Sequence, residues 1–485
     1  MLKKAIDRYK FLPVQVKASF WFLICAFLQK GVSFITTPIF TRILSTEEYG
    51  LYNVYNSWLG ILTVLVTLNL GRGVFVRGMV KFKDEKDQFA SSLQGLTMLL
   101  VIAWTLLYLI FNEGINKFIG LTTVQMLLML CTIWMTAVFT FWSVEQRVDY
   151  KYRTLVIITA IVSVTGPFLG IILVINASDK VTARILGIAI VDFVAYIGLL
   201  LSQIKRGKKF YSAFFWKHAL SFNIPLVPHY LSQTVLNSAD RIMINSMVGA
   251  GAAGIYGLAY SISQIMTMFN TALMQTIEPW LYQKINEKKV MDISKVAYPA
   301  FVIIGIVNLA LIALAPEMVR LFAPSAYFDA IWVIPPVAMS VFFTFSYAFF
   351  AVFEFYYKRT KLVAIASCAG AVLNIVLNYV FINIFGYFAA GYTTLFCYIV
   401  YAMFHYYFMK KLCKLYLDGV EPFSTKLYLV IAVSFMAAGF VLLYLYNYSI
   451  VRYAVIIISI IVMIIHRKII IKTIKMLMTS RKATT

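Results

Sequence analysis

Long apolar runs follow one another along almost the whole chain, each bounded by polar residues or by glycine and proline. A run of about 20 apolar residues is long enough for a helix to cross a lipid bilayer. The pattern therefore predicts about fourteen membrane-spanning helices, at residues 18–43, 51–71, 89–111, 121–143, 154–176, 183–203, 221–247, 253–276, 296–315, 328–350, 361–383, 387–408, 426–446 and 451–470. The second, seventh and tenth runs are the least regular, because Asn, Gln, His or Pro interrupts them.

The composition agrees with a membrane protein and excludes other classes. The 485 residues are 61% hydrophobic and only 13% charged, and the mean hydropathy is +0.83. Soluble domains are about 45–50% apolar and about 25% charged, so a soluble fold of this size would have too little polar surface. A cytosolic enzyme, a secreted disulfide scaffold and a disordered chain are excluded. The fold class predicted is an all-α polytopic membrane protein.

The placement of positive charge predicts the orientation. The net charge is +23, and with the N-terminus inside, 35 of the 43 Lys and Arg residues fall on the inner side and 5 on the outer side. Lys and Arg concentrate in cytoplasmic loops of membrane proteins. This bias predicts a multi-pass protein of the cytoplasmic membrane with both termini in the cytoplasm, and it explains the basic composition without a nucleic-acid partner.

An internal repeat is indicated at an offset of 204 residues. Gly50-Leu51-Tyr52 aligns with Gly254-Ile255-Tyr256, each at the start of the helix that follows a long polar-studded run. Because an offset of six helices preserves orientation, the two halves would be parallel repeats. We therefore predict six-helix bundles at 1–210 and 211–415 around a central cavity, with two additional helices and a basic cytoplasmic tail at 416–485.

Positive side chains inside the predicted spans point to an anionic substrate. Lys30 lies near the middle of the first span, Arg42 nearer its outer end, and Arg241 in the outer part of the seventh span. A charge within a bilayer is costly unless it faces water or a partner. A cavity with these three cations would attract a phosphate-bearing substrate and repel a cationic one. The alternative, above all for Arg241, is a structural ion pair with an acid on another span.

Other polar residues of the spans are secondary candidates. The acidic candidates for ion coupling, to protons or sodium, or for structural pairing are Asp240, Glu278 and Asp192. Asp192 is favoured as a structural partner. The polar residues expected to line the cavity are Gln29, His229, Gln233 and Asn237. Side chains of these types can hydrogen-bond sugar hydroxyls.

The motifs of several other functions are missing. The sequence has no phosphate-binding loop of the G-x-x-x-x-G-K-[ST] type, so it does not predict ATP-driven pumping. Its five cysteines and four histidines are dispersed, without the spacing of a metal site or a disulfide framework. No catalytic constellation can be assembled. We predict a transporter with no cofactor and no catalytic residues.

Two segments carry a family resemblance. Residues 34–55 (FITTPIFTRILSTEEYGLYNVY) resemble the first-helix signature of the polysaccharide biosynthesis (oligosaccharide flippase, Wzx-type) family, and residues 237–260 (NSADRIMINSMVGAGAAGIYGLAY) resemble its seventh-helix signature. The family belongs to the multidrug/oligosaccharidyl-lipid/polysaccharide (MOP) exporter superfamily. The resemblance implies two six-helix bundles around a V-shaped cavity. It also implies that cations in the matching segments contact the phosphates of the substrate.

The implied function is the flipping of an undecaprenyl-diphosphate-linked oligosaccharide repeat unit, a precursor of O-antigen, capsule or exopolysaccharide, across the cytoplasmic membrane by alternating access. Membrane lipids and a polysaccharide polymerase complex are the expected partners. Two alternatives stay open, a cation-coupled drug exporter of the same superfamily and a lipid II flippase. A membrane enzyme or scaffold of envelope synthesis is a more distant third.

Overall fold

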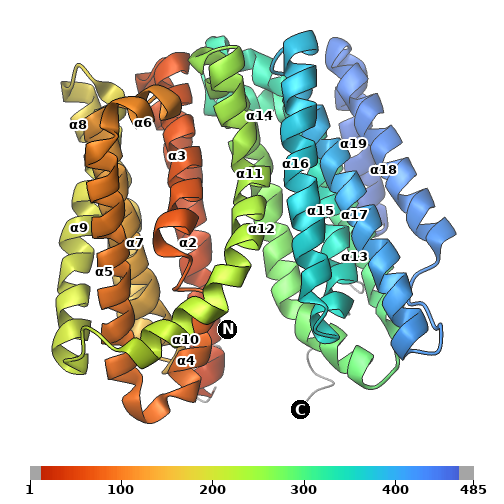
Figure 1. Cartoon of the computed structure of the whole chain (residues 1–485). Coiled ribbons are helices and arrows are strands. Elements are labelled where there is room, and N and C mark those ends of the chain that lie inside the picture. Colours follow the sequence, from red (N-terminus) through yellow and green to blue (C-terminus); the bar gives the residue numbers. More distant parts are fainter. Residues whose placement is uncertain (1–12, 469–485) are drawn as a thin grey trace, which may run out of the picture. The chain divides into compact units, whose positions relative to one another are not determined.

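The structure is a computed structural model and describes residues 13–468. Within these residues every regular element is a helix, as Figure 1 shows. The all-α fold class predicted from the apolar runs is confirmed. The basic tail beyond residue 468 lies outside the described residues.

The chain divides into two compact units, Met1–Ser238 and Ala239–Thr485. The division comes later than the predicted boundary at 210/211, because α10 (Ala213–Asn223) packs against α4 and α5 of the first unit. In that contact the Trp216 indole N–H donates to the backbone oxygen of Ser92 at 2.9 Å. The first of the two additional helices, α18 (Thr425–Tyr444), packs against α13 (Met291–Ala313) and α15 (Ile334–Tyr356) of the second unit.

The first unit is a helix bundle in which α9 contacts α5, α7 and α8, and α2 lies along α8. Aromatic and aliphatic side chains of α3, α5, α7 and α9 form its core. Its elements are α2 (Val14–Ile43), α3 (Thr46–Thr67), α4 (Val74–Lys81), η1 (Lys83–Glu85), α5 (Lys86–Ile110), α6 (Asn112–Ile119), α7 (Thr123–Val148), α8 (Tyr152–Asn176), α9 (Lys180–Gly207), α10 and η2 (Ile224–Leu226). The division between the units falls within α11 (Val227–Met247).

The second unit is a bundle centred on α15, which packs against α12, α13 and α17. Its interior is rich in phenylalanine: the Phe301 ring contacts those of Phe345 and Phe349 edge to face. The elements are α12 (Ala250–Asn286), α13 (Met291–Ala313), α14 (Ala315–Phe322), η3 (Ser325–Trp332), α15 (Ile334–Tyr356), α16 (Thr360–Phe385), α17 (Ala389–Tyr416), α18 (Thr425–Tyr444), η4 (Leu445–Asn447) and α19 (Ser449–Ile465).

Helix starts are set by local capping chemistry. The Ser45 hydroxyl accepts from the Glu48 backbone N–H at 3.1 Å, and the Glu48 carboxylate accepts from the Ser45 N–H at 2.8 Å. This reciprocal capping box satisfies two backbone donors that a helix start leaves without partners. Helix α3 therefore begins at Thr46, before the limit of residue 51 that hydropathy alone predicts.

The seventh predicted span is interrupted rather than continuous. Helix α10 ends at Asn223, a short 3₁₀ turn follows, and α11 begins at Val227. Pro225 lies in the turn and Pro228 in the first turn of α11. Proline lacks the backbone N–H that a helix interior needs but fits its first turn. In Figure 1 α10 runs at a steep angle to α11, so the chain changes direction at these prolines.

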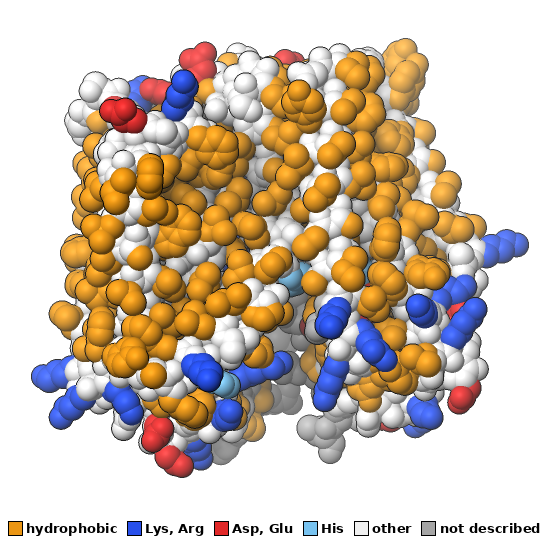
Figure 2. Space-filling model, in the orientation of Figure 1, with side chains coloured by type: hydrophobic (Ala, Val, Ile, Leu, Met, Phe, Trp, Pro, Cys, Tyr) orange, Lys and Arg blue, Asp and Glu red, His pale blue; other side chains and the backbone are white. Residues whose placement is uncertain are grey.

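The surface of each unit is that of a membrane protein. Among the described residues nine helices are long and apolar enough to cross a membrane, and Ser449–Ile465 is a shorter apolar helix. Each of the fourteen predicted spans contains helix within residues 13–468, although a 3₁₀ turn interrupts the seventh. Figure 2 shows apolar side chains over the flanks of each unit, with Lys and Arg gathered towards one end. This distribution fits spanning helices with basic loops on one side.

Candidate functional site

The two predicted cations of the first span lie on α2 and are both exposed. Arg42 donates through Nη1 to the backbone oxygen of Pro38 at 2.7 Å. Lys30 lies twelve residues before Arg42, which is about 18 Å along a helix. Gln29, beside Lys30, is also exposed. The two cations therefore belong to one helix without forming one compact cluster.

Polar residues of α11 form a stripe along one side of that helix. His229, Gln233 and Asn237 are spaced four residues apart, which places them on one helix face. Gln233 and Asn237 are exposed, and His229 is half-buried. The Asn237 amide donates to the backbone oxygen of Gln233 at 2.7 Å. These three predicted lining residues are thus grouped on one face.

Asp240 and Arg241 are neighbours on α11 but meet different surroundings in the second unit. The Arg241 guanidinium lies over the Tyr260 ring, 4.2 Å from its centroid. Cation–π contacts of this kind favour arginine over a flat aromatic face. Asp240 is turned into the unit and is only 1% exposed. The chain therefore separates the cation from its acidic neighbour.

The Asp240 carboxylate accepts hydrogen bonds from three helices. The donors are the Tyr256 hydroxyl of α12 at 2.7 Å, the Asn378 amide of α16 at 2.6 Å and the Thr394 hydroxyl of α17 at 2.9 Å. Asn378 also accepts from the Thr393 hydroxyl. All these donors are uncharged, and no ion pair of Asp240 occurs among residues 13–468. Asp240 is thus a buried carboxyl group surrounded by neutral hydrogen-bond donors.

Oxygen atoms are concentrated around this carboxylate. The Asn374 amide oxygen lies 3.3 Å from the Asn378 nitrogen. The Asn374 side-chain nitrogen is buried and has no hydrogen-bond partner in the described part of the chain. Carboxylate, amide and hydroxyl oxygens are the groups that hard cations prefer. No group of three or more His, Cys, Asp or Glu residues able to hold a metal occurs among the described residues.

A second buried acid was not identified from the sequence. Glu354 of α15 lies against His405 of α17, with Oε1 2.5 Å from Nδ1, and both side chains are 0% exposed. The other oxygen of Glu354 and the other nitrogen of His405 are buried and have no hydrogen-bond partner within the described chain. The Tyr347 ring stacks on the imidazole with centroids 5.3 Å apart. The pair therefore sits in an aromatic enclosure.

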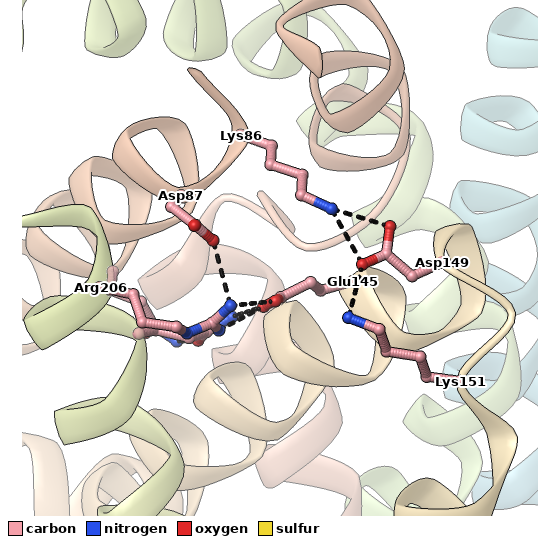
Figure 3. Close-up of polar contacts among 8 residues, drawn as sticks. Lys86, Asp87, Glu145, Asp149, Lys151 and Arg206 are labelled. Atoms are coloured by element: carbon pink, nitrogen blue, oxygen red, sulfur yellow. Dashed lines mark hydrogen bonds and ion pairs between the residues drawn. The ribbon is translucent and has the colours of Figure 1, made fainter. Parts of the chain in front are cut away.

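The first unit holds a carboxylate of a different kind, shown in Figure 3. Glu145 of α7 is 2% exposed and receives both guanidinium nitrogens of Arg206 of α9, at 2.6 and 3.0 Å. Gln203 donates to the same carboxylate at 2.9 Å, and Arg206 also contacts Asp87 of α5 at 3.1 Å. A bidentate arginine is among the strongest partners of a carboxylate. This cluster joins α5, α7 and α9.

Beside this cluster, Asp149 at the end of α7 lies between two lysines. Its carboxylate is 2.9 Å from Lys86 and 3.1 Å from Lys151. Partial burial acts to raise the pKa of Asp149, but the hydrogen bonds and positive charges of the two lysines outweigh it and lower the pKa below its ordinary value. Asp149 is therefore a charged partner of the lysines at neutral pH.

The remaining acidic candidates lie apart from these groups. Asp192 of α9 is 9% exposed and makes no hydrogen bond among residues 13–468. The ion pair favoured for it is thus absent from the described part of the chain. Glu278 of α12 is half-buried and likewise has no described hydrogen-bond partner.

The spacing of polar residues in α16 and α17 is a sequence signal for the partners of the two buried acids. Asn374 and Asn378 are spaced four residues apart in an otherwise apolar helix, and Thr394, Tyr398, Tyr401 and His405 follow a spacing of four, three and four. Such spacing places residues on one helix face. Polar residues aligned on one face of a spanning helix indicate a protein-facing or water-facing side. This reasoning would have found the partners of Asp240 and Glu354.

Relatives of the chain include two proteins of Haemophilus influenzae. One, described as an uncharacterized membrane protein, is 23% identical over 372 residues, which is 73% of this chain and 86% of that protein. The other, Lsg locus putative protein 1, is 23% identical over 380 residues, 74% of this chain and 89% of that protein.

Solved transporters share the fold. The lipid II flippase MurJ, in an inward closed conformation, matches with a TM-score of 0.66 at 17% identity over 92% of this chain and 99% of its own. An inward-facing multidrug resistance MATE transporter of the MOP superfamily matches with a TM-score of 0.60 at 14% identity, covering 81% of this chain and 96% of its own. These similarities establish the fold of the chain.

Two family models match the sequence. The MatE model covers residues 225–380. The model described as polysaccharide biosynthesis protein covers residues 16–284, more than half of the chain. It includes both segments that carry the resemblance seen in the sequence. This multi-pass membrane protein therefore belongs to the polysaccharide biosynthesis protein family.

Proposed function

We propose that the chain is a flippase that moves an undecaprenyl-diphosphate-linked oligosaccharide repeat unit across the cytoplasmic membrane by alternating access. Membership of the polysaccharide biosynthesis family supports this proposal. The family and its fold support a transporter. The lipid-linked oligosaccharide is our inference from the chemistry of the spans.

The observation that carries the proposal is the exposure of positive side chains on α2. This helix is long and apolar enough to span a membrane, yet Lys30 and Arg42 are exposed on it. Lipid does not tolerate an exposed charge at the middle of a spanning helix. Lys30 therefore needs either water or an anion beside it, and a diphosphate supplies such an anion. Arg241 would add a third cation, supported by Tyr260.

A cation-coupled drug exporter is the main alternative, and the match to the MatE model favours it. Such an exporter needs an accessible carboxylate for its cationic substrate. Asp240 is buried and engaged by three donors, so it is not open to a drug molecule. A lipid II flippase, suggested by the MurJ fold, is a variant with the same diphosphate lipid and a different glycan.

The proposal also includes an energy source and an orientation. We assign ion coupling, to protons or sodium, to Asp240 in preference to Glu278 and Asp192, because Asp240 alone joins three helices through hydrogen bonds. We place both termini in the cytoplasm, as the distribution of Lys and Arg indicates. A polysaccharide polymerase complex is the expected acceptor of the flipped lipid.

Complementation of a strain that lacks its own repeat-unit flippase tests the proposal. The wild-type chain should restore surface polysaccharide. The triple variant Lys30→Ala, Arg42→Ala, Arg241→Ala should reduce export at least tenfold at equal membrane abundance. A control triple variant at exposed lysines outside the spans, Lys83→Ala, Lys117→Ala and Lys411→Ala, should export normally.

Parallel assays separate the alternatives. Increased drug resistance without polysaccharide export would favour the drug exporter. Survival of cells depleted of their lipid II flippase would favour that variant. Normal export by the triple cation variant would overturn the assignment of the binding residues.

A further inference from the structure

We propose that the interface between α15 and α17 is a proton pathway of the second unit, with the Glu354–His405 pair as a proton-binding site at one end and Asp240 at the other. This inference rests on the proposed transport function and identifies its coupling ion as the proton. It is carried by the position, burial and spacing of the polar side chains along these two helices.

The Glu354–His405 pair has the composition of a proton-holding site. It contains one acid and one titratable base, both fully buried, joined by one contact of 2.5 Å. A single shared proton leaves the pair neutral overall, whichever residue holds it, and a neutral pair is the form that a buried site favours. The second oxygen of Glu354 and the second nitrogen of His405 remain without partners. These two atoms are where a further proton can enter and leave.

The pair is isolated from other charges. The titratable side chains that face it are Tyr347 from α15 and Tyr401 from α17, whose rings lie 5.3 and 4.5 Å from the imidazole. Within the described part of the chain, the electrostatic partner of Glu354 is His405. Helix α16 contributes the Ser367 hydroxyl, which is bonded to Tyr401 at 2.8 Å. A proton on the pair is therefore not already fixed by a permanent counter-charge.

A row of hydroxyl groups leads from this pair towards Asp240. Along α17 the row consists of Thr394, Tyr398, Tyr401 and His405. Thr394 donates to Asp240 at 2.9 Å. The rings of Tyr398 and Tyr401 are 6.5 Å apart, and Tyr401 is edge-on to His405. Eleven residues separate Thr394 from His405, so the row spans about 16 Å of the helix.

Several side chains surround Asp240 at its end of the proposed proton pathway. Tyr256 and Tyr260 come from α12, and Cys397 and Tyr398 from α17; each of these four interacts electrostatically with Asp240. Arg241 of α11 itself interacts with Tyr256 and Tyr260. Helix α16 contributes only the neutral Asn374 and Asn378 amides to this cluster. Asp240 is thus a single carboxylate next to the first hydroxyl of the row.

Proton transfer along this row needs no oxidant, reductant or other reactant, because each group takes up one proton and releases one. A proton leaves the Asp240 carboxyl, and each hydroxyl accepts one proton while it releases its own. His405 takes the proton at Nε2 and releases the one at Nδ1 to Glu354, and Glu354 releases it from its other oxygen. The residues of the row are about one helical turn apart along α17, and the proposal places a bridging water between successive groups. Chains of Asp, Glu and His serve as such relays in membrane transporters.

The interface between α7 and α9 of the first unit has a different lining. In the corresponding α7–α9 pair the acid in the last turn of α7, Glu145, is held by Arg206, which cannot release its proton. Between Glu145 and Asp192 the interface is filled by Met135, Val138 and Leu200 with Tyr196. Hydroxyl groups therefore line the seam of one unit, and mainly aliphatic groups that of the other.

Protonation of the pair can be measured directly. The full chain, labelled with ¹⁵N-histidine and placed in nanodiscs, is studied by NMR between pH 5 and 9, and the His405 signal is assigned with His405→Gln. We expect the His405 signal to change with pH and Glu354→Gln to alter that change. The signals of His218 and His466 should be unaffected by Glu354→Gln. A His405 signal that stays constant across this range, or that ignores Glu354→Gln, would overturn the proposal.

The coupling is measured by export in the complemented strain. Collapse of the transmembrane pH gradient should reduce wild-type export at least tenfold, and removal of the sodium gradient should leave it within twofold. His405→Gln and Tyr401→Phe should each reduce gradient-driven export at least tenfold, while His218→Gln retains it. Export that follows sodium and ignores the pH gradient would overturn the proton assignment.

The two experiments distinguish failure of the proposed transport function from failure of the proton pathway. If the wild-type chain restores no export, the proposed function fails, whereas the NMR titration still tests the pair. If His405→Gln is not recovered as a folded, monodisperse protein, Tyr401→Phe provides the test, because it removes one hydroxyl and keeps the ring. Full pH-gradient dependence of Tyr401→Phe would overturn the pathway.

Discussion

Two carboxylates, one in each unit, occupy similar places and have different partners. Glu145 lies in the last turn of α7 and Glu354 in the last turn of α15. Both helix ends share a backbone pattern, in which Lys151 N–H donates to the Gln146 oxygen and Arg359 N–H to the Glu354 oxygen, so Glu354 matches the residue directly after Glu145. Yet Glu145 meets a guanidinium, and Glu354 meets an imidazole.

The difference in partner sets what each carboxylate can do. A guanidinium stays protonated at all accessible pH values, so Glu145 and Arg206 form a permanent ion pair with additional support from Gln203. An imidazole changes charge in the physiological range, so Glu354 and His405 can exchange protons. The first unit thus holds a permanent ion pair, Glu145–Arg206, and the second unit holds a pair that can exchange protons, Glu354–His405.

Removal of the Arg206 guanidinium should have the largest effect on stability. Arg206→Ala leaves Glu145 buried without its cation, and we expect a loss of about 3 kcal/mol of stability. Thermal unfolding of the purified chain in detergent measures the effect. Lys86→Ala, at a more exposed ion pair of the same unit, is the matched control and should cost less than about 1 kcal/mol. Equal effects of the two variants would show that the bidentate pair is no more stabilising than the exposed one.

Asp240→Asn tests the neutral-donor cluster of the second unit. The amide offers one acceptor atom and one donor group where three donors converge on a carboxylate. At least one donor then faces the new amide N–H₂, at a cost of about 2 kcal/mol in stability. Gradient-driven export should fall in parallel. A variant with normal stability and normal export would exclude Asp240 from both roles.

Much of the fold follows from the sequence, because spanning helices must satisfy every backbone group internally and so leave a strong hydropathy signal. Each of the fourteen predicted spans contains helix in the described residues, although a 3₁₀ turn interrupts the seventh. The predicted starts of helices were less accurate where capping chemistry or proline sets the observed start, as at Ser45 and Pro225. Those local signals are readable, but hydropathy does not contain them.

The candidate site was less predictable, because it depends on which faces of distant helices meet. The sequence identifies Asp240 as an unusual residue of a span, but its donors Asn378 and Thr394 lie more than a hundred residues away. Glu354 lies close enough to the basic loop at Lys358 to be taken for a surface acid. Its complete burial against His405 becomes evident only when α15 and α17 are packed together.

Asp192→Asn tests a buried acid that differs from Asp240 in its surroundings. Unlike Asp240, Asp192 makes no hydrogen bond among residues 13–468. Burial of an unpaired charge is unfavourable, so the neutral amide should leave stability unchanged or raise it by about 1 kcal/mol. The midpoint of thermal unfolding measures this, with Asp240→Asn as the contrasting variant. A large loss in Asp192→Asn would reveal a partner that the carboxylate needs.

The smallest expected effect concerns Asp149 and pH. The folded pKa of Asp149 is lowered by Lys86 and Lys151 after burial has acted against it, so folding favours the charged form. Its contribution to stability is therefore fully present above its unfolded pKa of about 3.9 and is lost as the pH falls through the lower folded value. Asp149→Asn should remove less than about 1 kcal/mol at pH 7. It should also flatten the loss of stability below pH 4, measured as unfolding midpoints in a series of acidic buffers. An unchanged acid slope would mean that the two lysines are as well satisfied by water as by Asp149.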